Sequence, residues 1–371
     1  MEQKLKTFNP LNVSSKFAIC GLPIRVDTYK SCSHACEYCF SNNRVVCEFD
    51  KTLQVANLKQ IERKLKAIFE QGKVDSTNFL DTLIANRITW HCGGMSDPFQ
   101  PIENKYHITK QMIDICNQYN ISILFSTKGN DVFGADIRPD LHTFQLSVTN
   151  THNMKSIEPN VPSIESRYKF YKELKSLGFR VGIRIQPFIP NISTLEIVEM
   201  FNDADNFTLE GIKIVPQNEE HKNYILNTLS LNREDFTQMG LLNLKPEIRI
   251  DAYKPFIEYF DKHNIPYSIA DNDLHYLGVN NCCCGDRLIT KSTNFNNTAL
   301  FKKYGINYTK EQADAEIESS GCQNCKCNQL FTSNRQEGCV SVQDFYDKRF
   351  DRKSSPFSPK FQYKVNTQQN D

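Results

Sequence analysis

The sequence lacks a long apolar run, a charge excess of either sign and a leader-like start. No stretch reaches the ~18 apolar residues of a membrane-spanning helix, so no membrane partner is expected. The 371 residues carry 44 Lys and Arg against 43 Asp and Glu, a net charge of +1. This balance does not support a nucleic-acid partner, although local basic patches leave one open. The first residues, Met-Glu-Gln-Lys-Leu-Lys, have no apolar stretch behind them, which predicts a cytoplasmic protein without signal peptide or anchor.

Cysteine, by contrast, is abundant, with 14 residues. Because disulfides are disfavoured in the cytoplasm, clustered cysteines there indicate metal or redox chemistry. Three lie within 32–39 and six within 282–327, whereas the other five are scattered. The chain is longer than one usual core. We therefore expect a core domain over 1–270, a cysteine-rich module over 271–340 and a basic, flexible tail over 341–371.

Strand-like and helix-like segments alternate between residues 17 and 270. The expected strands cover 17–25, 88–92, 121–126, 143–149, 180–186, 211–215 and 267–270, and the expected helices cover 56–71, 106–119, 164–177, 195–203 and 252–263. Such βα units predict an α/β fold with a parallel sheet. Two strands alternate apolar with polar residues, among them Gln145, Ser147, Arg184 and Gln186. A barrel whose inner face lines a ligand cavity explains these polar residues better than an open sheet packed on both faces.

The first cysteine cluster is the C-x3-C-x2-C run of Cys32, Cys36 and Cys39. Three thiolates on one short loop can bind three irons of a [4Fe–4S] cluster and leave the fourth iron without a protein ligand. An open metal position is where a substrate or cofactor can bind. The alternative is a zinc knuckle with His34 as the fourth ligand, which is disfavoured because His34 lies too close to Cys32 and Cys36 in the sequence.

Four motifs in sequence order resemble those of the radical S-adenosylmethionine (SAM) superfamily, in its spore-photoproduct-lyase-like branch. The cysteine loop, with aromatic Tyr38 before its last cysteine, is the first. The second is the stretch 93–103, Gly-Gly-Met-Ser-Asp-Pro-Phe-Gln-Pro-Ile-Glu. The third runs from Ile157 to Pro162, followed by Arg167, and the fourth is Gln-Pro-Phe-Ile-Pro at 186–190. The resemblance implies a partial (β/α)6-type parallel barrel of radical SAM type with a C-terminal cysteine-rich extension.

The resemblance also implies a reaction, in which the cluster donates one electron to SAM and a 5′-deoxyadenosyl radical then abstracts hydrogen from a substrate. Such a cluster needs a low-potential electron donor such as flavodoxin or ferredoxin. Gly93 and Gly94 would let the backbone approach the SAM amino group. Ser147 would contact the ribose or carboxylate of SAM, and Arg184 its carboxylate, unless both only fill the barrel as paired polar residues. Glu158 would bind substrate or cap the helix that begins near residue 163.

The sequence departs from spore photoproduct lyases in one respect. Those enzymes carry a cysteine hydrogen donor close to the serine that contacts SAM, whereas residues 141–150 contain no cysteine. This difference argues against thymine-dimer repair, so the substrate stays unidentified.

A second group of cysteines predicts another metal site. Cys322, Cys325 and Cys327 are close enough to share one metal, and Cys284, from the run 282–284, would complete the set. The site would hold an auxiliary iron–sulfur cluster or a structural zinc ion.

Three functions remain open from the sequence. The first is a photolyase-like radical SAM enzyme with an unidentified substrate. The second is a radical SAM maturase that modifies a peptide or protein and uses the auxiliary cluster. The third is a non-enzymatic iron–sulfur or zinc protein that binds nucleic acid through its basic tail. Polar residues inside the barrel and the 93–103 motif oppose the third.

Overall fold

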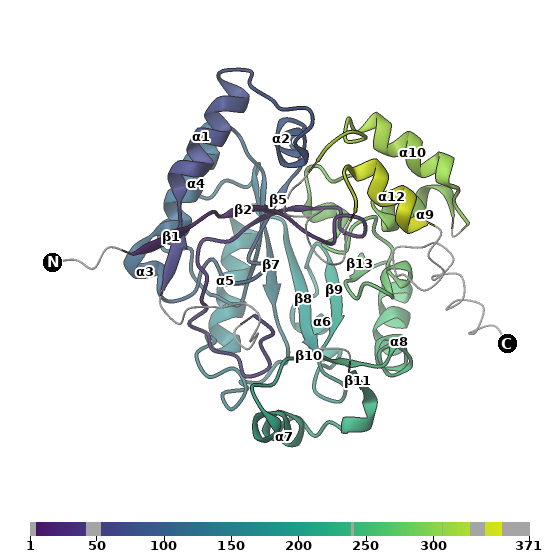
Figure 1. Ribbon diagram of the computed structural model, residues 1–371. Coiled ribbons are helices and arrows are strands. Elements are labelled where there is room, and N and C mark those ends of the chain that lie inside the picture. The colour runs from purple at the N-terminus through teal and green to yellow at the C-terminus, as the bar shows by residue number, and fades with distance from the viewer. Residues whose placement is uncertain (1–4, 42–52, 239–240, 306, 327–337, 351–371) are drawn as a thin grey trace.

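The structure is a computed structural model that describes residues 5–41, 53–238, 241–305, 307–326 and 338–350. Its main feature is one eight-stranded sheet in the order β13-β9-β8-β7-β6-β5-β3-β2. The strands are β2 (Leu11–Val13), β3 (Ile24–Val26), β5 (Trp90–Cys92), β6 (Ile123–Thr127), β7 (His142–Ser147), β8 (Val181–Phe188), β9 (Phe207–Gly211) and β13 (Tyr267–Ile269). All neighbours pair in parallel except β2 with β3. The sheet curves without closing on itself, as a partial barrel does (Figure 1).

Helices follow the strands and cover the sheet (Figure 1). They are α1 (Leu58–Phe69), α2 (Phe79–Ala85), α3 (Glu103–Tyr106), α4 (Ile108–Gln118), α5 (Ile164–Ser176), α6 (Glu196–Met200), α7 (Glu219–Thr228), α8 (Pro246–His263), α9 (Asn297–Tyr304), α10 (Lys310–Ser319) and α12 (Val342–Phe350). Short strand pairs lie beside the main sheet: β1 (Lys6–Phe8) with β4 (Gln54–Ala56), and β10 (Lys213–Ile214) and β11 (Phe236–Gln238) with β12 (Leu242–Leu244). No helix in the described ranges combines the length and apolar character needed to cross a membrane.

The two sides of β7 show why the barrel forms. The ring of Phe144 packs on those of Phe170 of α5 and Phe179, with centroids 6.3 and 5.5 Å apart, between the sheet and its helices. Gln145, the next residue, is buried on the other side, where its amide donates to Thr208 Oγ1 at 3.3 Å. Apolar residues thus face the helices and polar residues face the barrel interior, which confirms the alternation predicted from the sequence.

Two expected strands were misplaced. Residues 17–19, at the start of the expected strand 17–25, form turns, and the strand itself covers only Ile24–Val26. The expected strand 211–215 begins earlier, as β9 over Phe207–Gly211, and continues as the separate strand β10. In both places a buried apolar stretch suggested a strand, although burial alone does not distinguish a strand from a packed turn.

Residues 280–293, placed in the predicted C-terminal module, close the amino-terminal end of the barrel. Thr143 Oγ1, at the start of β7, donates to the carbonyl oxygen of Leu288 at 2.6 Å. Arg180, just before β8, donates to the carbonyl oxygen of Arg287 at 2.9 Å. The carbonyl oxygen of Lys291 accepts from the backbone N–H before β5 at 2.9 Å. This segment, hereafter the barrel plug, therefore packs as part of the barrel.

The basic tail, expected to be flexible from residue 341, begins as a packed helix. In α12, Phe345 is 1% exposed, and its ring lies 4.7 Å from that of Phe17. Tyr346 donates to the carbonyl oxygen of Phe295 at 2.7 Å. The prediction of a flexible arm is therefore wrong for Val342–Phe350, because its apolar face is buried, and residues 351–371 lie outside the described ranges.

Candidate functional site

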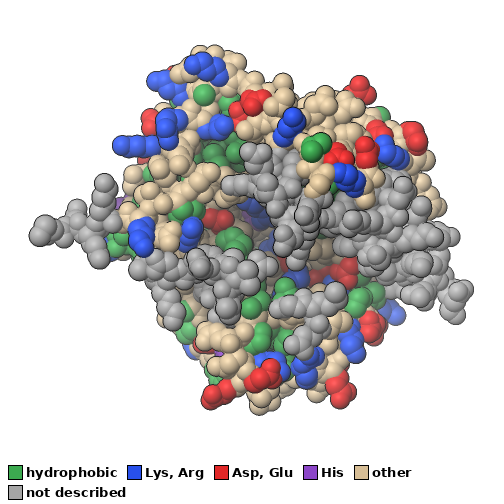
Figure 2. Space-filling model, in the orientation of Figure 1, with side chains coloured by type: hydrophobic (Ala, Val, Ile, Leu, Met, Phe, Trp, Pro, Cys, Tyr) green, Lys and Arg blue, Asp and Glu red, His purple; other side chains and the backbone are tan. Residues whose placement is uncertain are grey.

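A cavity of about 320 Å³ lies inside the barrel and opens toward the carboxyl ends of its strands. Figure 2 shows the molecule hollowed near the centre of one face, with hydrophobic and charged side chains visible within. The cavity is lined by every residue predicted to hold the first cluster or SAM: Cys32, Cys36, Cys39, Gly93, Gly94, Ser147 and Arg184. Segments far apart in the sequence therefore meet at one place, as the motifs predict.

The cysteine loop is held by the 93–103 motif. Gln100 accepts from the backbone N–H of Ser33 at 2.6 Å, and its amide donates to the carbonyl oxygen of Ser31 at 2.9 Å. Glu103 receives the backbone N–H groups of Thr109 and Lys110 at 3.1 and 2.9 Å, at the amino end of α4. The motif thus fixes the loop with one side chain and caps the helix behind it with another.

Asp97 is the central acceptor of this motif. Its Oδ1 accepts from Thr127 Oγ1 at 2.6 Å and from the N–H of Phe99 at 2.9 Å. Its Oδ2 accepts from the N–H of Lys128 at 2.6 Å and lies 3.2 Å from His34 Nε2. Burial would raise the pKa of Asp97, but its contacts with His34 and Thr127 lower it below the usual value.

His34 is not available as a fourth metal ligand. Its Nε2 faces Asp97, and its Nδ1 lies 3.1 Å from the carbonyl oxygen of Asn160, so both ring nitrogens have a partner. Burial opposes the charged ring, but Asp97 raises the pKa of His34 above its usual value. In addition, the sulfurs of Cys32, Cys36 and Cys39, all in the described part of the chain, do not gather within 4.8 Å of one another. Thiolates bound to different irons lie farther apart than ligands of one ion, so the loop fits a cluster better than zinc.

Gly93 leaves no room for a side chain, and Gly94 leaves little unless Arg25 shifts. Gly93 has φ +99°, and a Cβ there would lie 2.1 Å from the carbonyl oxygen of Ser126. A Cβ on Gly94 would lie 3.0 Å from Arg25 Nη1. The strand exit therefore presents bare backbone to the cavity, which fits the predicted contact with the amino group of SAM.

Glu158 does not cap the helix that begins near residue 163, whereas its predicted contact with substrate stays a prediction. It accepts from Lys128 Nζ at 2.8 Å and from the hydroxyl of Tyr38. Ser163, not Glu158, caps α5 by accepting from the N–H of Ser166 at 3.2 Å. Burial would raise the pKa of Glu158, but the charges of Lys128 and Arg167 lower it to about 2. Glu158 thus ties the cysteine loop, through Tyr38, to the end of β6.

Arg184 is already paired within the protein. Its guanidinium contacts Glu210 of β9, and Glu210 also contacts Lys213. Arg184 and Ser147 both line the cavity, and the backbone carbonyl of Ser147 accepts from Arg167 at 2.7 Å. The predicted contacts of Ser147 and Arg184 with SAM stay predictions.

Several charged residues of the cavity wall were missed by the sequence reading. Lys16, Arg25, Glu210 and Lys213 all line the cavity, as does His91. The imidazole of His91 bonds to Arg25 through Nδ1 and to Ser126 Oγ through Nε2, the latter at 2.8 Å. Burial and the charge of Arg25 lower the pKa of His91 well below its usual value, so the ring is neutral. Arg25 and His91 lie on β3 and β5, which have three residues each, too few to show an alternation that would have revealed them.

Of the second predicted cysteine site, Cys322 and Cys325 lie on one turn with interacting side chains, but Cys284 is not grouped with them. Cys284 lines the cavity, whereas Cys325 Sγ lies 3.2 Å from Thr82 Oγ1 of α2, and Cys322 packs near the same helix. Cys284 instead belongs to a group with Cys282 and Cys283, whose three sulfurs lie within 4.8 Å of one another. In the sequence, the helices α9 and α10 lie between Cys284 and Cys322. Cys327 lies outside the described residues.

Solved structures with a similar fold were found for this chain. No family model matches the chain, and no curated protein matches it. Spore photoproduct lyase complexed with dinucleoside spore photoproduct matches with a TM-score of 0.52 and 14% identity, over 71% of this chain and 81% of that one. A mutant spore photoproduct lyase with bound AdoMet and dinucleoside spore photoproduct matches with a TM-score of 0.50 and 15% identity, over 69% and 78%. The chain therefore shares the fold of spore photoproduct lyase, a partial barrel as its motifs predict.

Proposed function

We propose that the protein is a radical SAM enzyme that holds a [4Fe–4S] cluster on Cys32, Cys36 and Cys39 and cleaves SAM reductively to abstract hydrogen from a substrate. The observation that carries this proposal is the meeting of these three cysteines with Gly93 and Gly94 around one cavity. When bound, the cluster and SAM supply the one-electron chemistry, while the protein supplies position and shelter from water.

The chain's own residues prepare the site in two ways. Asp97 and Gln100 hold the cysteine loop from one side, and Glu158 holds it from the other through Tyr38. The unsubstituted backbone of Gly93 leaves space for a ligand's polar group to approach. These contacts fix the loop through residues that are not cluster ligands, which would hold the three cysteines in position for the cluster.

The cavity also carries charges suited to an anionic group. Arg25, Lys16 and Lys213 face it, and of these Lys213 is paired with Glu210. A carboxylate such as that of SAM would be stabilised by these cations. We propose that Arg184 contributes to this field while Glu210 fixes its orientation.

The other two hypotheses gain no support from the described residues. A maturase with an auxiliary cluster needs Cys284 near Cys322 and Cys325, yet the latter two contact α2. A nucleic-acid protein that binds through its tail needs a free arm, yet the tail begins as the packed helix α12. We therefore favour the enzyme, with flavodoxin or ferredoxin as electron donor and a cytoplasmic location, where a reduced cluster persists.

The decisive assay measures 5′-deoxyadenosine after anaerobic reconstitution with iron and sulfide, using reduced flavodoxin or dithionite as the reductant. The wild-type chain should form 5′-deoxyadenosine from SAM, and Cys36→Ala should form none. Cys116→Ala, which removes a buried thiol of α4 remote from the cavity lining, should retain the activity. If the wild-type chain with a spectroscopically verified reduced cluster forms no 5′-deoxyadenosine, the proposal fails.

A further inference from the structure

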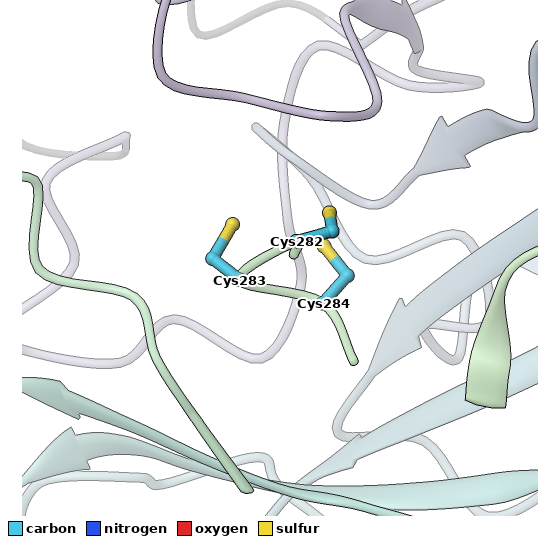
Figure 3. A group of neighbouring side chains, drawn as sticks. All are labelled: Cys282, Cys283 and Cys284. Carbon is cyan, nitrogen blue, oxygen red and sulfur yellow. The ribbon is translucent and has the colours of Figure 1, made fainter. Parts of the chain in front are cut away.

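Three consecutive thiols gather on the barrel plug. The sulfurs of Cys282, Cys283 and Cys284, hereafter the cysteine trio, lie within 4.8 Å of one another. Figure 3 shows the three side chains leaving one turn with their sulfurs on the same side. Cys282 and Cys284 are buried, whereas Cys283 is half-buried and lines the cavity together with Cys284. None of these thiols has a role in the proposed binding of the first cluster.

The turn that carries the trio is fixed by its surroundings. The N–H of Gly285 donates to the carbonyl oxygen of Cys282 at 3.0 Å, and Asp286 accepts from the N–H of Cys282 at 3.1 Å. Gly285 has φ +90°, and a Cβ there would lie 2.4 Å from the side chain of Asn206. Because the backbone is held at both ends of the turn, the sulfurs converge without any rearrangement of the chain.

The spacing of the sulfurs suits one metal ion. A tetrahedral zinc ion with sulfur ligands at about 2.3 Å places those sulfurs about 3.8 Å apart. The sulfurs of the trio, within 4.8 Å of one another, are already close to that separation. Ligands of a [4Fe–4S] cluster bind different irons and are spread more widely. The arrangement therefore favours a single thiophilic ion over a second cluster.

Cationic side chains compensate the charge of such a site. Three thiolates and a divalent ion carry a net charge of −1, which needs compensation in a buried place. The guanidinium groups of Arg25 and Arg184 both interact electrostatically with Cys283 and Cys284. Arg25 also donates to Cys20 Sγ at 3.7 Å. The cavity thus offers positive charge on the side that the trio faces.

We propose that the cysteine trio binds one zinc ion at the base of the barrel cavity, with the fourth coordination position open toward the cavity. The side chain of Cys20 interacts with Cys283, but its sulfur does not lie within 4.8 Å of all three sulfurs of the trio. An ion with three protein ligands keeps a position for water or for a donor atom of a substrate. Binding releases the protons of the three thiols. This site is independent of the proposed reaction at Cys32, Cys36 and Cys39.

The test uses cobalt(II) as a spectroscopic substitute for zinc in the full-length chain. The background variant Cys32→Ala/Cys36→Ala/Cys39→Ala removes the first cluster, so its absorption does not obscure the spectrum. We expect one cobalt ion per chain, with thiolate-to-cobalt charge-transfer and tetrahedral d–d bands, and displacement by zinc. Adding Cys282→Ser/Cys283→Ser/Cys284→Ser should abolish these bands. The single change Cys284→Ser should weaken cobalt binding about tenfold or more and leave the circular dichroism spectrum unchanged.

Matched variants locate the ion. Cys322→Ser/Cys325→Ser should retain the cobalt bands, because that pair packs beside α2. Cys20→Ser should also retain them, since the fourth position is open to the cavity. Loss of the bands in either of these variants, with retention in the variants of the trio, would overturn the proposal. So would incorporation of iron and sulfide by the background variant in place of one zinc or cobalt ion.

Discussion

Replacing Asp97 by asparagine tests whether the 93–103 motif positions the cysteine loop. The substitution keeps the volume but turns one acceptor oxygen into a donor. If Oδ2 is replaced, the bonds from the N–H of Lys128 and from His34 are lost. Hydrogen bonds to a charged group contribute about 1.5–3 kcal/mol each, so the free energy of unfolding should fall by about 3–6 kcal/mol. That is a large fraction of the ~5–15 kcal/mol that stabilises a folded domain.

The assay has two readouts, thermal unfolding of the metal-free chain and iron content after reconstitution. Asp97→Asn should lower both, because His34 belongs to the loop that carries Cys32 and Cys36. The matched control is Asp75→Asn, since Asp75 is exposed and bonds to the nearby Thr77. It should leave both readouts unchanged. If Asp97→Asn unfolds at the wild-type temperature and takes up full iron, Asp97 does not position the loop.

Three further changes test other parts of the structure. Gly93→Ala should prevent SAM binding and destabilise the fold far more than Gly134→Ala, because both glycines have positive φ but only Gly93 meets a backbone oxygen at 2.1 Å. Because the folded pKa of Glu158 is lowered to about 2, its ionised carboxylate should contribute about 3 kcal/mol to the free energy of unfolding above pH 4.5. This contribution should be lost as the pH falls toward 2. Glu158→Gln should remove this pH dependence from acid unfolding curves. Phe345→Ala should lower the free energy of unfolding by about 3–5 kcal/mol in urea, because it empties the contact with Phe17.

Controls for these changes come from exposed positions. Glu62→Gln on α1 should leave the acid unfolding curve as in the wild type. Val340→Ala, at a side chain that is 65% exposed, should leave the urea midpoint unchanged. A Phe345→Ala chain with wild-type stability would show that α12 does not belong to the folded core, and equal effects of Gly93→Ala and Gly134→Ala would refute the close approach at the strand exit.

The residues proposed for the first cluster could be picked out from the sequence because their motifs are local; the structure brings them to one cavity, and their binding of a cluster stays a prediction. Cys32, Cys36 and Cys39 occupy one short loop with a recognisable spacing, and the resemblance of the 93–103 stretch to a family motif indicated Gly93 and Gly94. The alternation along β7 correctly placed polar residues inside the barrel. What these features share is a signal contained within ten residues.

The remaining parts depend on contacts between distant segments. Arg25 and His91 meet because β3 and β5 pair in parallel, and the sequence around each residue does not indicate that the other lies beside it. Cys284 and Cys322 seemed to form one site because both belong to a cysteine-rich region, but α9 and α10 carry the chain away between them. Phe17 looked like a strand residue because it is apolar, yet it is buried in a turn against Phe79 and Phe345. Three-dimensional packing decided each case.

The position of the barrel plug late in the chain has a consequence for biosynthesis. The strands β2 to β13 leave the ribosome before residues 280–293, yet those residues supply the backbone carbonyl groups that Thr143 and Arg180 require. A nascent chain that ends near residue 270 therefore has an unsealed barrel with buried polar groups open to water. Folding must wait for the plug, so the enclosed interior comes into being only once more than three quarters of the polypeptide has been made.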